Sequence, residues 1–368
     1  MTKIKVKQKR KSPFAKEKME LSEMLFKGSI TLFFAVVFVV CFLAFGGVKV
    51  FQTTYFVDTF HSFDFQIHTI DVENGDAFLL RLPQNKTMLI DCGERTYEDR
   101  VTSYITQYLH SEQLNTIDYF VLTHTDSDHI GNAEAIIEKF NVKNLYRPKV
   151  YAVDERDYTT TNGLFNTSLS DEYNDAICAA YQKGCNIIFS ESDLQIALPN
   201  CTIKFLSPTE NSYSKDNNYS AVLMIEYFSN KFLFMGDAEH EIENLLIAKY
   251  GTQLKADVLK LAHHGSKTST TEEFLNVVQP TYAILSCSES STILPNNEVI
   301  ARVEAAGCEI LSTASKGNFA ITLKQNCIVW QAEQQLFNYW AIILGILIVV
   351  DLVLWKLPLL NKKAKQKT

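Results

Sequence analysis

Apolar and polar positions follow two different spacings along residues 63–332. Runs rich in β-branched and aromatic residues predict strands, and apolar residues at helical spacing, such as Val101, Ile105 and Leu109, predict helices. Strands are expected over 65–72, 77–82, 88–90, 118–123, 186–189, 194–197, 202–206, 220–228, 231–236, 256–262, 281–286, 308–312 and 318–330. Helices are expected over 98–109, 132–140, 170–183, 239–249, from about 270, and over 297–306. Strands and helices alternate in both halves, so the pattern predicts one α/β domain.

Local signals refine this prediction. Asn74-Gly75 separates the first two strands and is a strong hairpin signal. Thr270 and Glu273 have the spacing of a capping box at the start of a helix. Residues 150–170 are polar and are expected to form a mobile loop beside the functional site.

Two longer apolar stretches flank this domain. Residues 29–50 carry no charge before Lys49 and are long enough to span a bilayer, which takes about 20 residues. Residues 337–356 indicate a second span, with a buried helix or a reversible membrane contact as the alternative. Lysine-rich tails precede the first stretch and follow the second, and the positive-inside rule places both termini in the cytoplasm. The domain between them would then be extracytoplasmic.

The resulting map of the chain has six parts. They are a basic tail (1–28), a transmembrane helix (29–50), a linker (51–62), the α/β domain (63–332), a second transmembrane helix (337–356) and a basic tail (357–368). The leader before the first apolar run is longer than that of a cleaved signal peptide, and the run itself is too long. The first stretch is therefore interpreted as an uncleaved anchor in the cell membrane.

The charge between the two spans restricts the partners of the domain. Residues 51–335 contain 20 basic and 38 acidic residues, a net charge of −18. Proteins that bind nucleic acid neutralise phosphates with Lys and Arg, so this balance disfavours nucleic acid as a partner. The expected partners are the bilayer and a small phosphoester or cell-envelope substrate.

Cysteines do not settle the redox state of the domain. Seven lie between the apolar stretches, an odd number, and none forms a Cys-x-x-Cys pair for zinc. Most lie near expected strands and are interpreted as small core residues. Disulfide bonding stays open.

Residues able to bind metal follow three of the expected strands. The first group is His124-Thr-Asp126-Ser-Asp128-His129, in which a short loop is expected to direct four metal-binding side chains toward one point. Asp237 follows a second strand, and His263 and His264 follow a third. Four of the chain's eight histidines fall in these motifs, which a scatter of surface histidines would not produce.

The order of these motifs resembles the metallo-β-lactamase superfamily. The segments Ile70-Asp-Val-Glu-Asn-Gly-Asp76, Leu89-Ile-Asp-Cys-Gly93 and Phe234-Met-Gly-Asp-Ala238 join the histidine motifs in the family order. Within the superfamily, the likeness is to the hydrolase domain of ComEC-type competence proteins. The resemblance implies a four-layer αβ/βα sandwich and two divalent metal ions, zinc or manganese.

The resemblance also implies how the ligands divide. His124 and Asp126 would bind one metal, Asp128 and His129 the other, and Asp237 would bridge both. One of His263 and His264 would complete the second site, and His264 is favoured because it directly precedes Gly265.

The first metal site departs from many relatives. Asp126 stands where they have histidine, and the segment 216–220 (Asp-Asn-Asn-Tyr-Ser) stands where they have another. Oxygen ligands of this kind favour manganese or magnesium over a second zinc.

A bound divalent metal lowers the pKa of water and supplies hydroxide near neutral pH. Asp126 or Asp128 would orient that water or accept its proton. Asp76 and Asp91 are expected to hold ligand imidazoles, with plain turn-capping aspartates as the alternative.

One position departs from the ComEC-like pattern, which has a histidine where this chain has Leu294. Either Lys267 or Ser266 contacts the phosphate or the leaving group instead, or turnover is slow, or the substrate differs.

Together these features predict a membrane-anchored, metal-dependent hydrolase of a phosphodiester or phosphomonoester, such as a choline-phosphate or lipid head-group ester. Two alternatives stay open. One is a DNA nuclease linked to competence, and the other is a non-catalytic metal-binding module of the same fold.

Overall fold

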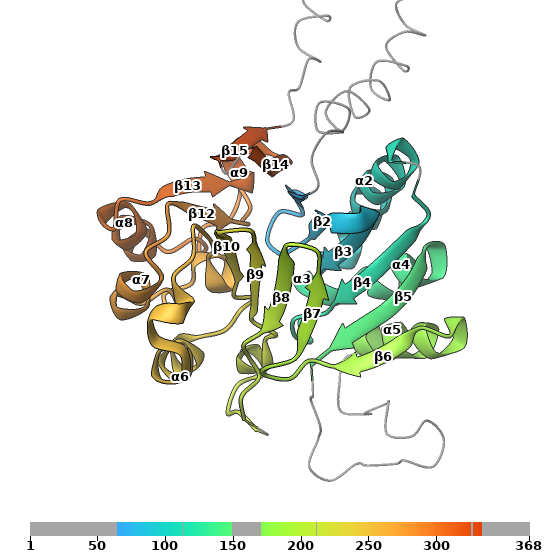
Figure 1. Ribbon diagram of the computed structural model, residues 1–368, viewed down its shortest axis with the longest axis horizontal. Helices are drawn as coiled ribbons and strands as arrows, with labels where there is room; N and C mark the ends of the chain where they lie inside the picture. The colour runs from blue at the N-terminus through green and yellow to red at the C-terminus, as the bar shows by residue number, and fades with distance from the viewer. Residues whose placement is uncertain (1–64, 113, 149–170, 211, 325–326, 333–368) are drawn as a thin grey trace, which may run out of the picture. The chain divides into compact units, whose positions relative to one another are not determined.

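Two β-sheets lie face to face, and helices cover the outer side of each (Figure 1). The computed structural model describes residues 65–112, 114–148, 171–210, 212–324 and 327–332. All of these residues belong to one compact unit.

The first sheet has eight strands and mixes antiparallel with parallel pairs. Its strands, in spatial order, are β15 (Cys327–Ala332), β14 (Phe319–Lys324), β1 (Gln66–Thr69), β2 (Phe78–Leu82), β3 (Lys86–Ile90), β4 (Thr116–Val121), β5 (Asn141–Arg147) and β6 (Asn186–Phe189). β1 and β14 pair antiparallel, with Gln66 opposite Thr322, so the last part of the domain closes against its first strand.

The second sheet has seven strands. In spatial order they are β13 (Glu309–Ser312), β12 (Tyr282–Leu285), β11 (Val258–Lys260), β10 (Asn230–Phe234), β9 (Leu223–Tyr227), β8 (Cys201–Phe205) and β7 (Gln195–Leu198). β10 to β13 run parallel, which places the carboxyl ends of four strands at one edge.

The longer helices are α2 (Glu98–Ser111), α4 (Ala133–Lys139) and α5 (Asp171–Lys183) on the first sheet, and α6 (His240–Tyr250), α7 (Glu272–Val278) and α8 (Asn297–Ala305) on the second. Short helical turns, including α3 (Ser127–Ile130), η3 (Asp216–Tyr219), η5 (Ala262–Gly265) and α9 (Thr313–Lys316), connect strands at the edges.

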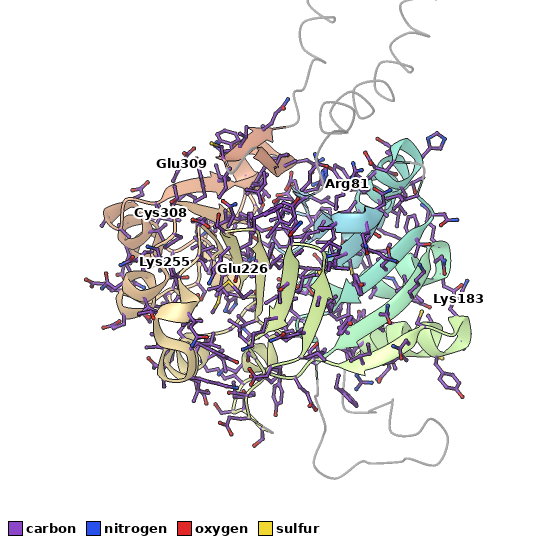
Figure 2. The ribbon with its side chains drawn as sticks, viewed as in Figure 1. Arg81, Lys183, Glu226, Lys255, Cys308 and Glu309 are labelled. Carbon is purple, nitrogen blue, oxygen red and sulfur yellow. The ribbon has the colours of Figure 1, made fainter. Side chains whose placement is uncertain are left out.

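Three apolar clusters stabilise the layers. One lies between the sheets, where Phe78, Val121, Phe232 and Ile284 are almost fully buried, and side chains fill this region (Figure 2). In a second cluster, α2, α4 and α5 pack against the first sheet. In a third, α6, α7 and α8 pack against the second sheet. Each layer is therefore held by its own apolar cluster, because burial of apolar surface stabilises the folded state by roughly 25 cal/mol per Å². The predicted αβ/βα sandwich is confirmed.

The structure corrects several element predictions. The single strand expected over 318–330 is two antiparallel strands, β14 and β15. The first hairpin pairs Thr69 with Phe78 and therefore closes through residues 70–77, a longer connection than the turn expected over 73–76.

The predicted capping box at Thr270 is wrong. The N-cap of α7 is Thr271, whose side chain accepts from Phe274 N, whereas Thr270 N donates to the buried Glu243 carboxylate.

The predicted spans, 29–50 and 337–356, and the predicted loop, 150–170, lie outside the described residues. Within the described ranges, no helix is long and apolar enough to cross a membrane.

Candidate metal centre

The candidate ligands lie where strands of both sheets end. His124 follows β4, and Asp237 follows β10 in the facing sheet. Asp128 and His129 lie on the short helix α3 rather than on the loop predicted from the sequence, and Asp126 precedes it as the N-cap. His263 and His264 lie on η5, directly after β11.

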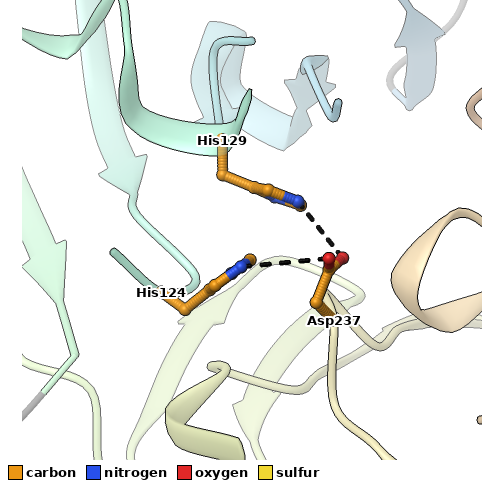
Figure 3. A group of neighbouring side chains, drawn as sticks. All are labelled: His124, His129 and Asp237. Atoms are coloured by element: carbon orange, nitrogen blue, oxygen red, sulfur yellow. Dashed lines mark ion pairs between the residues drawn. The ribbon is translucent and has the colours of Figure 1, made fainter. Parts of the chain in front are cut away.

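The four imidazoles converge on the carboxylate of Asp237. Its Oδ1 lies 3.2 Å from Nε2 of His129, and its Oδ2 lies 3.5 Å from Nε2 of His264. Nε2 of His124 and Nε2 of His263 each lie 3.9 Å from Oδ2. Figure 3 shows His124 and His129 pointing toward Asp237 from two directions.

The other ring nitrogen of three imidazoles is held by an oxygen. His129 Nδ1 donates to Asp91 Oδ2 at 2.7 Å, and His264 Nδ1 donates to the Ser286 carbonyl at 2.9 Å. His124 Nδ1 lies 3.0 Å from Thr123 Oγ1, whose own hydrogen goes to Asp91 Oδ2 at 2.7 Å, so the imidazole donates there too. Each Nε2 therefore presents a lone pair to the centre of the site.

These lone pairs need a cation between them. Nε2 of His129 lies 3.2 Å from Nε2 of His264, and both face carboxylate oxygens. Among the described residues, Nε2 of His124 finds no hydrogen-bond partner although the ring is fully buried. A buried polar atom left unpaired is costly, and converging imidazoles and carboxylates are the donor set of divalent transition metals. The residues fit a metal ion.

Side-chain charges support the same reading. Burial opposes the charge of His129, but the carboxylates of Asp237, Asp91 and Asp128 outweigh it and raise the pKa of His129 well above its usual range. Burial likewise opposes ionisation of Asp237, but the charges of His129 and His264 hold its pKa well below its usual range. The carboxylates therefore stabilise positive charge at this site, and protons or metal ions can supply that charge.

In the part of the chain that the structure describes, two of the three overlapping groups of possible ligand atoms face the centre, and the third joins His129 to Asp76 and Asp91 behind it. His124, His129 and Asp237 form one, and Asp128, His129 and His264 form another, with ligand atoms within 4.8 Å of one another in each. Asp128 Oδ2 lies 3.3 Å from Nε2 of His264. Asp126 Oδ2 lies 3.6 Å from Nε2 of His124, on the other side. His129 belongs to both groups, so the assignment of each ligand to one of two metal ions stays a prediction.

Asp91 performs the supporting role predicted for it. Besides His129 Nδ1 and Thr123 Oγ1, its carboxylate accepts from Thr123 N at 2.8 Å, so one fully buried side chain fixes two ligand-bearing segments. Such partners fix the tautomer and the orientation of the imidazole.

Asp91→Asn is expected to weaken metal binding by about 10- to 100-fold. Asparagine retains one acceptor oxygen and tolerates the positive φ of 54° at this position, but its amide group would face a donor. Titration of the metal-free full-length chain with manganese, followed by calorimetry, measures the change. Unaltered affinity in a folded variant would contradict the role assigned to Asp91.

For Asp76 the predicted role is wrong. Its carboxylate lies 3.7 Å from His264 Nδ1 and 4.0 Å from His129 Nδ1, beyond hydrogen-bond distance. It pairs instead with Nζ of Lys260 at 2.8 Å, and both side chains are at most 2% exposed. The sequence contained one signal for this pair, because Lys260 is the single charge in the apolar run of residues 258–262.

Backbone contacts hold the ligand segments together. Gly75, at φ +134°, packs so closely that a Cβ would lie 2.3 Å from the Asp128 carbonyl oxygen. The Asn132 side chain donates to the carbonyls of Cys92 and Glu94. The loop after β1, the loop after β3 and α3 are thereby fixed against one another.

The structure also places the remaining predicted residues. Segment 216–220 does lie at the site, where Ser220 Oγ accepts from Asp237 N at 3.1 Å and Asn217 Nδ2 lies 3.3 Å from His263 Nδ1. Ser266 is buried and its hydroxyl contacts Thr268, while Lys267 is exposed on the same loop. The catalytic role of Lys267 stays a prediction.

One cavity, of about 330 Å³, lies elsewhere, beside β8 and β9. Lys204, Glu226 and Tyr250 are among its lining residues, and none of the predicted site residues lines it. The candidate functional site is therefore identified by its metal-binding side chains and not by this cavity.

Fold and site together define an αβ/βα sandwich in which imidazoles and carboxylates that could hold metal converge at the ends of strands. Residues 70–173 and 213–289 match the family model of the metallo-beta-lactamase superfamily. The chain therefore carries a metallo-beta-lactamase superfamily domain, as the motifs predicted.

Proteins with ComEC-type domains are among its relatives. ComE operon protein 3 of Bacillus subtilis is 27% identical over 273 residues, which cover 70% of this chain and 33% of that protein. Recombination protein 2 of Haemophilus influenzae is 27% identical over 277 residues, which cover 75% and 31%. The chain thus spans about a third of the length of these relatives.

A similar solved structure is the metallo-beta-lactamase fold protein YhfI from Bacillus subtilis. It is 12% identical, with a TM-score of 0.43, and the alignment covers 73% of this chain and all of that one.

Proposed function

We propose that this protein is a metal-dependent hydrolase that cleaves phosphoesters, with a phosphodiester as the best-supported substrate class. The observation that carries the proposal is the convergence of three Nε2 lone pairs and the Asp237 carboxylate at one point. Oxygen atoms hold Nδ1 of each of these rings, so the Nε2 atoms face the centre, where they can bind cations.

The chain's own residues would divide the work. His124, Asp126 and Asp237 would hold one ion, and Asp128, His129, His264 and Asp237 the other. Two bound ions would supply Lewis acidity toward a phosphoryl oxygen and a nucleophile near neutral pH. Asp126 has a side chain 44% exposed, so its carboxylate can also orient water that enters from solvent.

Charge favours a small substrate over a polyanion. The relatives' names refer to recombination and to a competence operon, which makes DNA the second candidate. Residues 51–335, however, carry a net charge of −18, which repels nucleic acid except where bound metal offsets it. A choline-phosphate or lipid head-group ester of the cell envelope suits the proposed location.

That location is part of the proposal. Residues 29–50 and 337–356 are apolar enough by sequence to anchor the domain in the cell membrane. The lysine-rich tails would keep both termini in the cytoplasm and the metal centre outside.

Hydrolysis of bis-p-nitrophenyl phosphate by the full-length chain with manganese tests the proposed activity. We expect turnover that is lost in the Asp128→Ala, His129→Ala double variant, because this change removes two ligands and leaves Asp237 and His124 in place. Single-stranded DNA serves as the competing substrate.

Turnover of the ester without degradation of DNA would support the small substrate. Preferred degradation of DNA would support the nuclease. A folded, metal-loaded chain that hydrolyses neither would contradict the proposal and favour a non-catalytic binding module.

A further inference from the structure

One imidazole at the metal centre differs from the other three in exposure. The side chain of His263 is 27% exposed, whereas those of His124, His129 and His264 are at most 2% exposed. Nε2 of His263 nevertheless lies 3.9 Å from Asp237 Oδ2. The ring therefore lies at the rim of the centre, where it reaches solvent.

The hydrogen-bond environment of His263 is the opposite of that of the other three imidazoles, because its Nδ1 faces a donor rather than an acceptor. Its Nδ1 faces the amide nitrogen of Asn217, a donor, at 3.3 Å, and the Thr268 hydroxyl lies 3.5 Å away. The nearest carboxylate oxygen, Glu239 Oε1, is 3.9 Å away, beyond hydrogen-bond distance, and the other oxygen of Glu239 pairs with Lys215. Nδ1 therefore accepts, and the hydrogen of the neutral ring is on Nε2. A nitrogen that carries a hydrogen has no lone pair for a metal.

Resting on the hydrolase function proposed above, we infer that His263 is a substrate-contacting residue whose Nε2–H donates a hydrogen bond to the leaving-group oxygen. In the step concerned, the oxygen of water forms a bond to phosphorus, and the bond from phosphorus to the leaving oxygen breaks with its electron pair. The water releases one proton to solvent and the departing oxygen takes one from solvent, so the imidazole retains its hydrogen. The hydrogen bond stabilises the charge that develops on the departing oxygen.

This assignment supplies a hydrogen-bond donor for the leaving group, which the other residues considered for that role do not. Leu294 is partly buried and has no polar side chain to offer. Lys267 is exposed, and the Ser266 hydroxyl contacts Thr268. His263 is the one imidazole of the four that both faces Asp237 and reaches solvent.

Two substrates that differ only in the leaving group test the inference. Bis-p-nitrophenyl phosphate releases p-nitrophenolate, whose negative charge is delocalised into the nitro group. Diphenyl phosphate releases phenolate, whose more localised charge depends more on a hydrogen bond for its stabilisation. The variant is His263→Asn, because asparagine tolerates the left-handed backbone here, φ 49°. The matched control is His240→Gln, an exposed imidazole that contacts the same loop through the Thr268 carbonyl at 3.2 Å.

His263→Asn is expected to retain both metal ions, measured by mass spectrometry of the full-length chain. It should lose about 100-fold in kcat/KM on diphenyl phosphate and less than about 5-fold on bis-p-nitrophenyl phosphate. His240→Gln should match the unmodified chain on both substrates.

Loss of a metal ion in His263→Asn would overturn the inference, because His263 would then be a ligand. Equal losses on the two substrates would also overturn it while leaving the proposed function intact. If the unmodified chain hydrolysed neither ester, the proposed function would fail and this inference with it.

Discussion

Replacement of Asp237 by asparagine is expected to lower hydrolysis by at least about 1000-fold, which corresponds to about 4 kcal/mol of activation free energy. Among the described residues, Asp237 is the one carboxylate within 4 Å of all four imidazoles, with Oδ1 toward His129 and Oδ2 toward the other three. The amide removes the negative charge and turns one acceptor into a donor facing an imidazole. Initial rates with bis-p-nitrophenyl phosphate, together with metal content, measure the effect.

The control for this variant is Asp193→Asn. Asp193 is 54% exposed and pairs with Lys204 and Lys249 at the surface, so its loss should change the rate by less than about 2-fold. If Asp237→Asn bound two metal ions and retained its rate, the assignment of Asp237 as the bridging ligand would be wrong.

Lys260→Met is expected to lower the free energy of unfolding by about 3–5 kcal/mol, because it leaves the Asp76 carboxylate buried without its partner. Asp76 lies on the loop between β1 and β2 and Lys260 on β11, so the pair also joins the two sheets. Urea denaturation of the full-length chain, followed by circular dichroism, measures the change.

A double variant separates charge from packing. Asp76→Asn, Lys260→Met removes both charges and should recover most of the lost stability, since no unpaired ion is left buried. Lys249→Met, which breaks a surface pair with Asp193, should cost less than about 1 kcal/mol. A double variant no more stable than Lys260→Met would show that the charge pair is not the cause.

The sequence predicted the layers of the fold well, because most strands are short apolar runs bounded by polar turns. It missed β5, a strand of seven residues, and it failed where an element is too short to show a period. α3 has four residues, and it lies inside the metal-binding hexapeptide, so its sequence reads as a loop. The cap of α7 was misplaced by one residue because Glu243, from α6, binds the backbone at Thr270 and Thr271.

The candidate ligands were predictable because they follow strands in a recognisable order. Apart from that of Asp91, their supporting contacts were not, since these come from distant parts of the chain. Lys260 reads as an ordinary charge in a strand until the fold brings Asp76 to it. The different environments of His263 and His264 depend on Asn217 and on the Ser286 carbonyl, which no local pattern connects to the histidine pair.

The most direct test of the account is the metal content of the full-length chain before and after chelation, measured alongside hydrolysis of bis-p-nitrophenyl phosphate. We expect about two divalent ions per chain, with turnover that is lost on chelation and regained when manganese is added back. A folded chain that binds no divalent ion, or whose turnover survives complete removal of metal, would contradict the metal centre proposed for His124, His129 and Asp237.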